Sequence, residues 1–153
     1  MIRLSFLLFL FIFLTNNIFA QMSQMKVLEL SDAERIVNAA QERANQDNWT
    51  VAIAVVDAGG HLILLKKLDG TQIRSVQIAT EKAQTAVYYK RPTKVFQDRV
   101  AEGNTGILGL PDAIPFEGGI PIEVDGKIIG AIGVSGVTAQ QDGIVAQAGL
   151  DAL

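Results

Sequence analysis

The chain has 153 residues, with 13 Lys and Arg against 16 Asp and Glu, one His and no Cys. This mildly acidic balance lacks the basic footprint of a nucleic-acid binder, so we expect no nucleic-acid partner. Without cysteine there is no disulfide, thiol nucleophile or lipoprotein anchor, and one histidine cannot build a zinc site of several Cys or His ligands. The stability of the fold must come from a core, with subunit contacts as a further source.

The first 21 residues, MIRLSFLLFLFIFLTNNIFAQ, have the pattern of an export signal. Arg3 precedes an apolar run from Leu4 to Leu14, which is too short for a bilayer span of about 20 residues. Ala20 provides the small residue before a cleavage site. We expect cleavage after Ala20 and one domain over 21–153, periplasmic or secreted and not held by a membrane. An uncleaved anchor is the disfavoured alternative, because no cationic stop-transfer group follows.

The sequence of the first half of this domain predicts a helix followed by a hairpin. A capping box of Ser31 and Glu34 opens a helix over 31–46. The stretch 50–57, TVAIAVVD, is apolar on both faces and rich in β-branched residues, which indicates a central strand. A DAGG turn leads into a second strand over 61–68.

In the middle of the chain the spacing of apolar residues becomes that of a helix. The helix begins near Ile73 and is stopped by Arg91-Pro92. Thr93 is expected to cap a short helix that runs to about Glu102. The following loop, 103–119, is long enough to indicate a function and has room for one short strand at 106–110.

A second hairpin and a last helix complete the predicted domain. Strands over 120–124 and 127–134 flank Asp125-Gly126, the strongest short hairpin signal. Thr138 and Gln141 form another capping box, and Ile144 is expected to face the core. Hairpins alternating with helices predict an α+β layered domain.

Six glycines fall between positions 118 and 136, in GGIPIEVDGKIIGAIGVSG. The spacing of Gly130, Gly133 and Gly136 matches neither the dinucleotide fingerprint nor the P-loop. Gly130 and Gly133 lie inside a strand on opposite faces, where a missing side chain indicates the close approach of another group. Either a helix or a second subunit packs on the sheet there, or a flat ligand lies against it.

Several polar side chains are candidates for a ligand site. Lys82 and Thr85 are about one helical turn apart, and the end of that helix gathers Tyr88, Tyr89, Lys90 and Arg91. Cations there suit the negative end of the helix dipole. The functional interpretation is that cations meet ligand carboxylates while a tyrosine ring covers an apolar ligand, or its oxygen binds iron.

Three acidic and basic groups outside that helix have both a structural and a functional interpretation. His61, at a hairpin edge, is either a solvated strand residue or a metal ligand. Glu117, beside Gly118-Gly119, is either a solvated loop carboxylate or an acid/base group. Asp57 is most simply a turn former.

Four segments together are similar to a known family: VAIAVVDAGGHLILLKKLDG, SVQIATEKAQTA, PFEGGIPIEVDGKIIGAIGVSGVTAQQD and AQAGLDAL. In order and spacing they resemble the GlcG/HbpS-like haem-binding (haem-degrading domain) family, also found as the C-terminal domain of PduO-type proteins. The resemblance covers about residues 28–153. It implies a profilin-like α+β fold with a five-stranded antiparallel sheet flanked by helices, a homo-oligomer, and haem as cofactor. This chain departs from the family at Gly143, where an acidic residue is usual, and its first helix has no histidine.

These observations define a predicted site and three classes of function. The ligand is expected where the 103–119 loop meets the helix carrying Lys82. The expected cofactor-binding residues are Lys82, Thr85, Tyr88, Tyr89, Arg91, Glu117, Gly118 and Gly119, with His61 as the metal ligand. The resemblance favours a haem-binding protein for haem sensing or storage. The alternatives are an enzyme acting on a tetrapyrrole or small carboxylate, against which the scarcity of acid/base groups weighs, and a ligand-free scaffold subunit.

Overall fold

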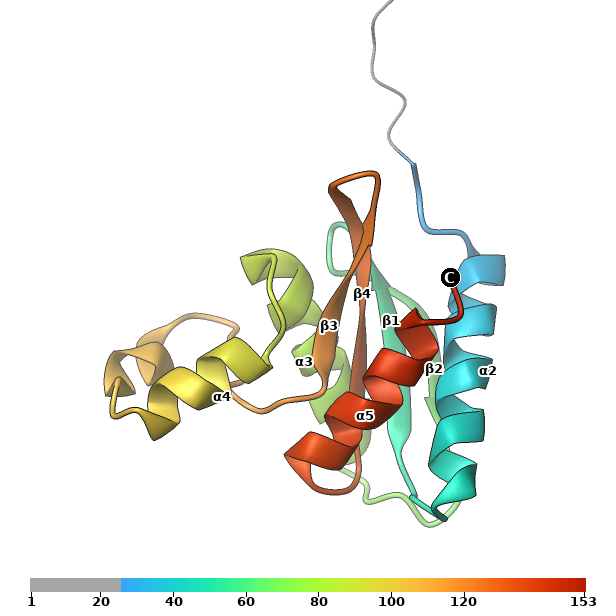
Figure 1. The fold of residues 1–153 in the computed structure, drawn as a ribbon, viewed down its shortest axis with the longest axis horizontal. Helices are drawn as coiled ribbons and strands as arrows, with labels where there is room; N and C mark the ends of the chain where they lie inside the picture. The colour runs from blue at the N-terminus through green and yellow to red at the C-terminus, as the bar shows by residue number, and fades with distance from the viewer. Residues whose placement is uncertain (1–25) are drawn as a thin grey trace, which may run out of the picture.

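The computed structural model describes residues 26–153 (Figure 1), so the predicted export signal lies outside the described residues. The elements in chain order are α2 (Leu30–Gln46), β1 (Ala52–Asp57), β2 (Leu62–Lys67), α3 (Ser75–Tyr89), α4 (Lys94–Ala101), the 3-10 helix η1 (Thr105–Gly109), β3 (Gly119–Val124), β4 (Lys127–Ser135) and α5 (Ala139–Leu150). Over this part of the chain, no helix combines the length and hydropathy needed to cross a membrane.

The four strands form one antiparallel sheet in the order β2-β1-β4-β3. The predicted hairpin between β3 and β4 is confirmed, with Val124 opposite Lys127. Asp125 and Gly126 both have positive φ, 52° and 73°, as the favoured two-residue hairpin turn requires. β3 is therefore an edge strand, and β1 and β4 are central.

Helices cover both faces of the sheet (Figure 1). α2 and α5 pack together on one face, where Ile36, Ile53 and Ile132 are fully buried in the larger core. α3 packs on the other face through small residues such as Ala79 and Ala83. α4 and η1 extend away from the sheet (Figure 1). The α+β architecture expected from the sequence is confirmed.

Several sequence expectations are wrong in detail. The sheet of residues 26–153 has four strands rather than five, because 105–109 form η1 where a strand was expected at 106–110. Two glycines within that helix, followed by Pro111, disfavour a strand. α2 begins earlier than expected, with Glu29 as N-cap in a capping box with Asp32, so Ser31 lies inside the helix. Ile144 is 40% exposed instead of facing the core.

Thr93 occupies the expected N-cap position of α4 but makes no side-chain cap. Its hydroxyl instead accepts a hydrogen bond of 2.9 Å from the amide of Gly119, while its own amide donates to the Gly119 carbonyl at 2.9 Å. Thr93 therefore covers the start of the β3 edge.

Packing within the chain explains the strand glycines. A Cβ at Gly133 would collide with the Ala79 carbonyl and lie 2.6 Å from the Ala83 nitrogen, both in α3. A Cβ at Gly130, on the opposite face, would collide with the Val56 carbonyl and lie 2.8 Å from Leu28. The chain itself fills both positions, which leaves no place there for a flat ligand or a second subunit.

Candidate functional site

Lys82 lies in the interior of the protein. Its Nζ donates to Asp142 Oδ2 at 2.8 Å and to the Val134 carbonyl at 3.0 Å, and both charged side chains are 3% exposed. Burial lowers the pKa of Lys82 and raises that of Asp142, while the attraction between the two charges opposes both shifts. Lys82 joins α3 to α5 and does not present its charge to a ligand at the surface.

Gly118 and Gly119 are also explained by this junction. Gly118 has a φ of +127°, and a Cβ there would lie 2.9 Å from Lys82 Nζ. A Cβ at Gly119 would collide with the Lys82 carbonyl. The bare backbone therefore lets the loop cross closely over α3, a role that the sequence could not distinguish from ligand contact.

Thr85 and Tyr89 anchor the long loop to α3. The Thr85 hydroxyl accepts from the Ile114 amide at 3.0 Å and lies 3.1 Å from the Asp112 carbonyl. The Tyr89 hydroxyl donates to the Pro111 carbonyl at 2.5 Å. A hollow of about 350 Å³ adjoins these contacts, but Glu81 and Asp112 line it. Two acidic side chains make this predicted location unfavourable for haem propionates.

Four of the predicted residues meet instead in a groove along the outer edge of β3, which we call the edge groove. It consists of two adjoining hollows of about 450 and 360 Å³, which share Pro92 and Ile120. The first is lined by Lys90, Arg91, Pro92, Ile120, Pro121, Glu123, Ile128, Leu150 and Leu153. The second is lined by Pro92, Lys94, Glu117, Gly118, Gly119, Ile120, Gly143, Ile144 and Gln147.

The charges of the edge groove are unevenly placed. Lys94 is paired with Asp98 at 2.7 Å. Lys90 and Arg91 form no ion pair with an acid among residues 26–153, and the Arg91 Nε donates only to the Tyr89 carbonyl. Two cations without acid partners therefore stand at one end of the groove, whose lining also includes the carboxylates of Glu117 and Glu123.

The edge groove fits a tetrapyrrole in part. Its apolar walls suit a flat macrocycle, and its two cations suit carboxylates. The side chains lining it include no His, Tyr or Met, so this part of the chain offers none of the usual neutral ligands or phenolates for iron. The apolar walls fit a macrocycle, but the groove offers no axial ligand for iron, and Glu117 and Glu123 lie in it beside the cations.

His61 and Tyr88 lie at a second surface, where the turn between β1 and β2 packs against the end of α3. Asp57 Oδ1 accepts from the amides of Gly59 and His61 at 2.8 and 2.9 Å, which confirms Asp57 as a turn former. These bonds, chiefly the one from His61, lower the pKa of Asp57. The Nδ1 of His61 lies 3.3 Å from the same carboxylate, and the side chain is 84% exposed.

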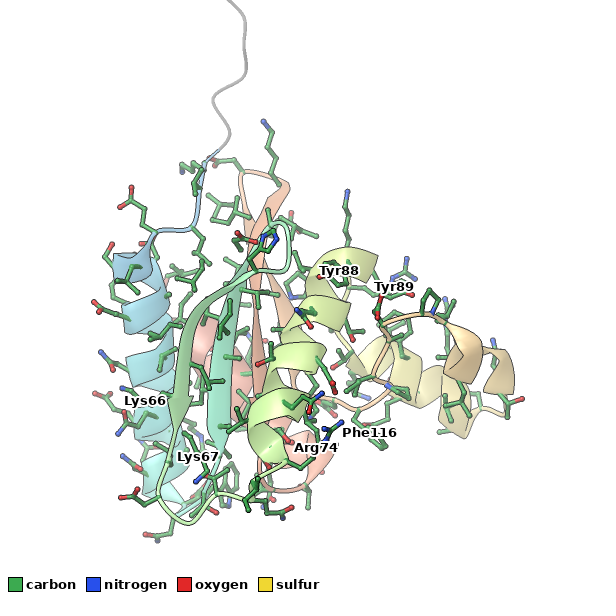
Figure 2. The ribbon with its side chains drawn as sticks, turned by 180° about the vertical axis from the view of Figure 1, so that it is seen from behind. Lys66, Lys67, Arg74, Tyr88, Tyr89 and Phe116 are labelled. Atoms are coloured by element: carbon green, nitrogen blue, oxygen red, sulfur yellow. The ribbon has the colours of Figure 1, made fainter. Side chains whose placement is uncertain are left out.

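Contacts with α3 hold this turn, residues 57–61, in place. Gly60 has a φ of +82°, and a Cβ there would lie 2.6 Å from Cζ of Tyr88. Gln84 Nε2 donates to the Gly60 carbonyl at 3.0 Å. Tyr88 lies on the last turn of α3 (Figure 2) and is 47% exposed. His61 and Tyr88 therefore share one solvent-facing surface.

Sequence reasoning missed Asp142, Pro92 and Ile120. Asp142 is the buried ion-pair partner of Lys82, but the sequence showed only that Asp142 lies in the first turn of a helix. Pro92 and Ile120 join the two hollows of the edge groove. Proline after a helix and an apolar strand residue carry no local signal of a binding surface.

Comparison with known proteins gives consistent matches. Residues 28–151 match the sequence profile of the family described as "Haem degrading protein HbpS-like". Protein GlcG of Escherichia coli K12 is 43% identical over 109 residues, 71% of this chain and 81% of GlcG.

Two solved structures share the fold. A double mutant of Streptomyces reticuli HbpS has a TM-score of 0.78 and 32% identity, and the match covers 88% of this chain and 92% of that one. The PduOC:haem complex also has a TM-score of 0.78, with 31% identity over 84% of this chain and 96% of that one. With a family match over nearly all of the described residues and the same fold, this chain belongs to the HbpS-like haem-degrading protein family.

Proposed function

We propose that this chain is an exported, homo-oligomeric haem-binding protein that serves in haem storage or sensing. The observation that carries the proposal is the similarity to the PduOC:haem complex, which extends over 84% of this chain. The edge groove provides a surface of suitable chemistry in this chain. Of the two other classes, a small enzyme acting on a tetrapyrrole agrees with the description of the family as haem degrading, whereas a ligand-free scaffold subunit lacks a comparable supporting observation.

Apolar contact supplies most of the expected affinity. The two hollows of the edge groove each fall within the range of about 300–1,000 Å³ that is typical of ligand pockets. Contacts from exposed cations to carboxylates contribute only about 0–1 kcal/mol each. Lys90 and Arg91 therefore mainly orient the ligand, with its carboxylates toward the end of α3.

A titration with two tetrapyrroles tests the proposal. Purified protein is titrated with haemin, followed by the Soret band, and with iron-free protoporphyrin, followed by fluorescence. Both ligands should bind saturably, because the groove recognises the macrocycle and its carboxylates. K90A/R91A should weaken both by less than about thirtyfold, as two exposed contacts of at most about 1 kcal/mol each allow. The matched control is K67A, which removes an exposed cation at the far end of β2 from the 57–61 turn.

Three outcomes would contradict parts of the proposal. Absence of saturable haemin binding would remove haem as the ligand and favour the scaffold alternative. An intact Met1–Ala20 segment in the native protein, detected by mass spectrometry, would contradict export through a cleaved signal. A monomer mass by light scattering at micromolar concentration, with and without haemin, would contradict the homo-oligomer.

A further inference from the structure

The two hollows of the edge groove differ in the polar groups that remain free to bind a ligand. The hollow of about 360 Å³, which Glu117, Gly118 and Gly143 help to line, is named the Glu117 hollow. We propose that the Glu117 hollow binds small organic cations, namely primary ammonium compounds with an apolar body. This site does not depend on the proposed haem binding, because it selects the charge opposite to that of haem propionates.

Both side-chain donors that line the Glu117 hollow already have acceptors. Lys94 Nζ donates to the two carboxylate oxygens of Asp98 at 2.7 and 2.8 Å. Gln147 Nε2 donates to Asp151 Oδ1 at 2.7 Å. The other lining residues are proline, glutamate, glycine and isoleucine, whose side chains have no donor. A ligand carboxylate would therefore meet no free side-chain donor in this hollow.

The side-chain acceptors of the Glu117 hollow are free. Among residues 26–153, the Glu117 carboxylate makes no ion pair and accepts no hydrogen bond, and Gln147 Oε1 accepts from no donor. A carboxylate forms its strongest hydrogen bonds with charged donors such as ammonium groups. The free groups therefore favour a ligand that donates hydrogen bonds and has a positive charge.

The charges around the hollow leave one carboxylate without a counter-charge. Lys82, behind Gly118, is paired with Asp142 at 2.8 Å. Lys94 is paired with its own aspartate at 2.7 Å. Glu117 attracts both cations, but each has a closer carboxylate partner. A cationic ligand would supply the charge that the described residues do not place at ion-pair distance from Glu117.

The fold holds the Glu117 side chain in the hollow. The segment that leads into β3 runs beside the N-terminal end of α5 (Figure 1), and the Glu117 amide donates to Gln97 Oε1 of α4 at 2.8 Å. The carboxylate lies over Gly143 of α5, where a Cβ would lie 2.5 Å from Oε1 and 2.9 Å from Cδ. The missing side chain at Gly143 therefore makes room for the carboxylate.

The walls of the hollow suit the hydrocarbon part of such a ligand. Pro92, Ile120 and Ile144 line it, and Ile144 is 40% exposed although it is apolar. The volume lies near the lower end of the range of about 300–1,000 Å³ for ligand pockets, which suits a single ring or a short chain. An ammonium group at Glu117 with its hydrocarbon part against Ile144 would use both features.

Three probes with the same ring and different head groups test the site: cyclohexylmethylammonium, cyclohexylmethanol and cyclohexanecarboxylate. Protein labelled with ¹⁵N-glycine is titrated at pH 7 and followed by NMR, because Gly118, Gly119 and Gly143 line the hollow whereas Gly59 and Gly126 do not. The ammonium probe should shift the first three signals saturably. The alcohol should bind about fivefold more weakly, as expected for the loss of one ion pair, and the carboxylate more weakly still.

Substitutions at the two residues in contact test the acceptor. E117Q keeps the shape of the side chain without its charge, so its affinity for the ammonium probe should fall to that for the alcohol. G143A should weaken ammonium binding to a similar extent, because the new Cβ displaces the flexible carboxylate. E117Q/G143A should show little further loss. E102Q is the matched control, since Glu102 is an exposed carboxylate that lines neither hollow of the edge groove.

Three results would overturn the proposal. Equal affinity of the wild type for the three probes would show that the hollow does not select a cation. An E117Q variant that binds the ammonium probe as tightly as the wild type would show that Glu117 is not the acceptor. Unchanged signals of Gly118, Gly119 and Gly143 at the solubility limit of the probe would exclude the hollow as the site. The haemin titration is a separate measurement, so either proposal can fail without the other.

Discussion

The middle and the end of α3 place two cations in opposite environments. Lys82 is 2% exposed and bonded to Asp142 and Val134, whereas Arg91, just beyond the helix, is exposed at the edge groove without an acidic partner. The buried cation cannot be moved without cost, so it fixes the contact of α3 with α5. The exposed cation loses little by changing partner, so it is available to a ligand. Burial and pairing, rather than charge alone, separate the structural cation from the one that is free to meet a ligand.

The largest expected effect is the loss of one member of the buried pair. K82M leaves the Asp142 carboxylate buried without its cation, which should lower the free energy of unfolding by about 3–5 kcal/mol. The double variant K82M/D142L should recover much of that loss, because well-packed apolar residues often replace a buried pair at little cost. Urea unfolding followed by circular dichroism measures both.

The exposed pair Lys94–Asp98 is the matched control for this comparison. It has a similar distance, 2.7 Å, but its side chains are about half exposed. K94M should therefore leave the free energy of unfolding nearly unchanged. Equal losses in K82M and K94M would show that burial does not decide the role of these cations.

The next effect concerns close packing of α3 on the sheet. G133A should destabilise by at least about 1–3 kcal/mol, because its Cβ would collide with the Ala79 carbonyl on rigid helical backbone. G109A is the control, since no atom lies within 4 Å of a Cβ at that position. Thermal unfolding of the two variants separates them. A G133A variant as stable as G109A would mean that α3 is free to move away from β4.

Local patterns in the sequence predicted the parts of the fold that local chemistry determines. The Asp125-Gly126 turn and the Thr138–Gln141 capping box need only neighbouring residues, and both are confirmed. The Lys82–Asp142 pair joins residues far apart in the sequence. Local patterns could not predict this ion pair, and Lys82 was therefore assigned to ligand binding. The resemblance led to five strands, but the glycines of η1 and the following proline replace one of them with a 3-10 helix.

The residues of the predicted site lie on separate surfaces, because their positions depend on contacts between distant parts of the chain. Arg91 lines one hollow of the edge groove and Glu117, Gly118 and Gly119 line the other, and their role in binding stays a prediction. Thr85 and Tyr89 hold the loop, and Tyr88 adjoins the His61 turn. Strand order determines which of these surfaces are neighbours, and helical spacing within α3 does not contain that information.

Removal of the Thr85 hydroxyl should have an intermediate effect. T85V keeps the shape of the side chain but leaves the Ile114 amide without its acceptor, and because this hydrogen bond is only partly buried the cost should stay below the roughly 1–3 kcal/mol of a buried group. The loss should be local, because Thr85 ties the loop to α3. Amide exchange at Ile114 should accelerate in T85V. T80V is the control, since the hydroxyl of Thr80 bonds only to Val76 within its own helix, and the Ile114 exchange rate should then stay unchanged.

The smallest expected effect is the opposite titration of two aspartates. Hydrogen bonds from backbone amides, chiefly that of His61, lower the pKa of Asp57 below 3.8. The ionised carboxylate of Asp57 therefore stabilises the fold above pH 3.8, and this stabilisation is lost as the pH falls through the lowered pKa. Burial raises the pKa of Asp142. The stability that comes from this shift is therefore fully present below pH 3.8 and is lost as the pH rises through the raised pKa. Carboxyl ¹³C shifts followed against pH should place the two midpoints on opposite sides of 3.8. The effect of Asp57 on stability should be slight, because its side chain is 38% exposed. If Asp142 titrates below 3.8, attraction to Lys82 outweighs burial, and the pair stabilises the fold more than the first prediction assumes.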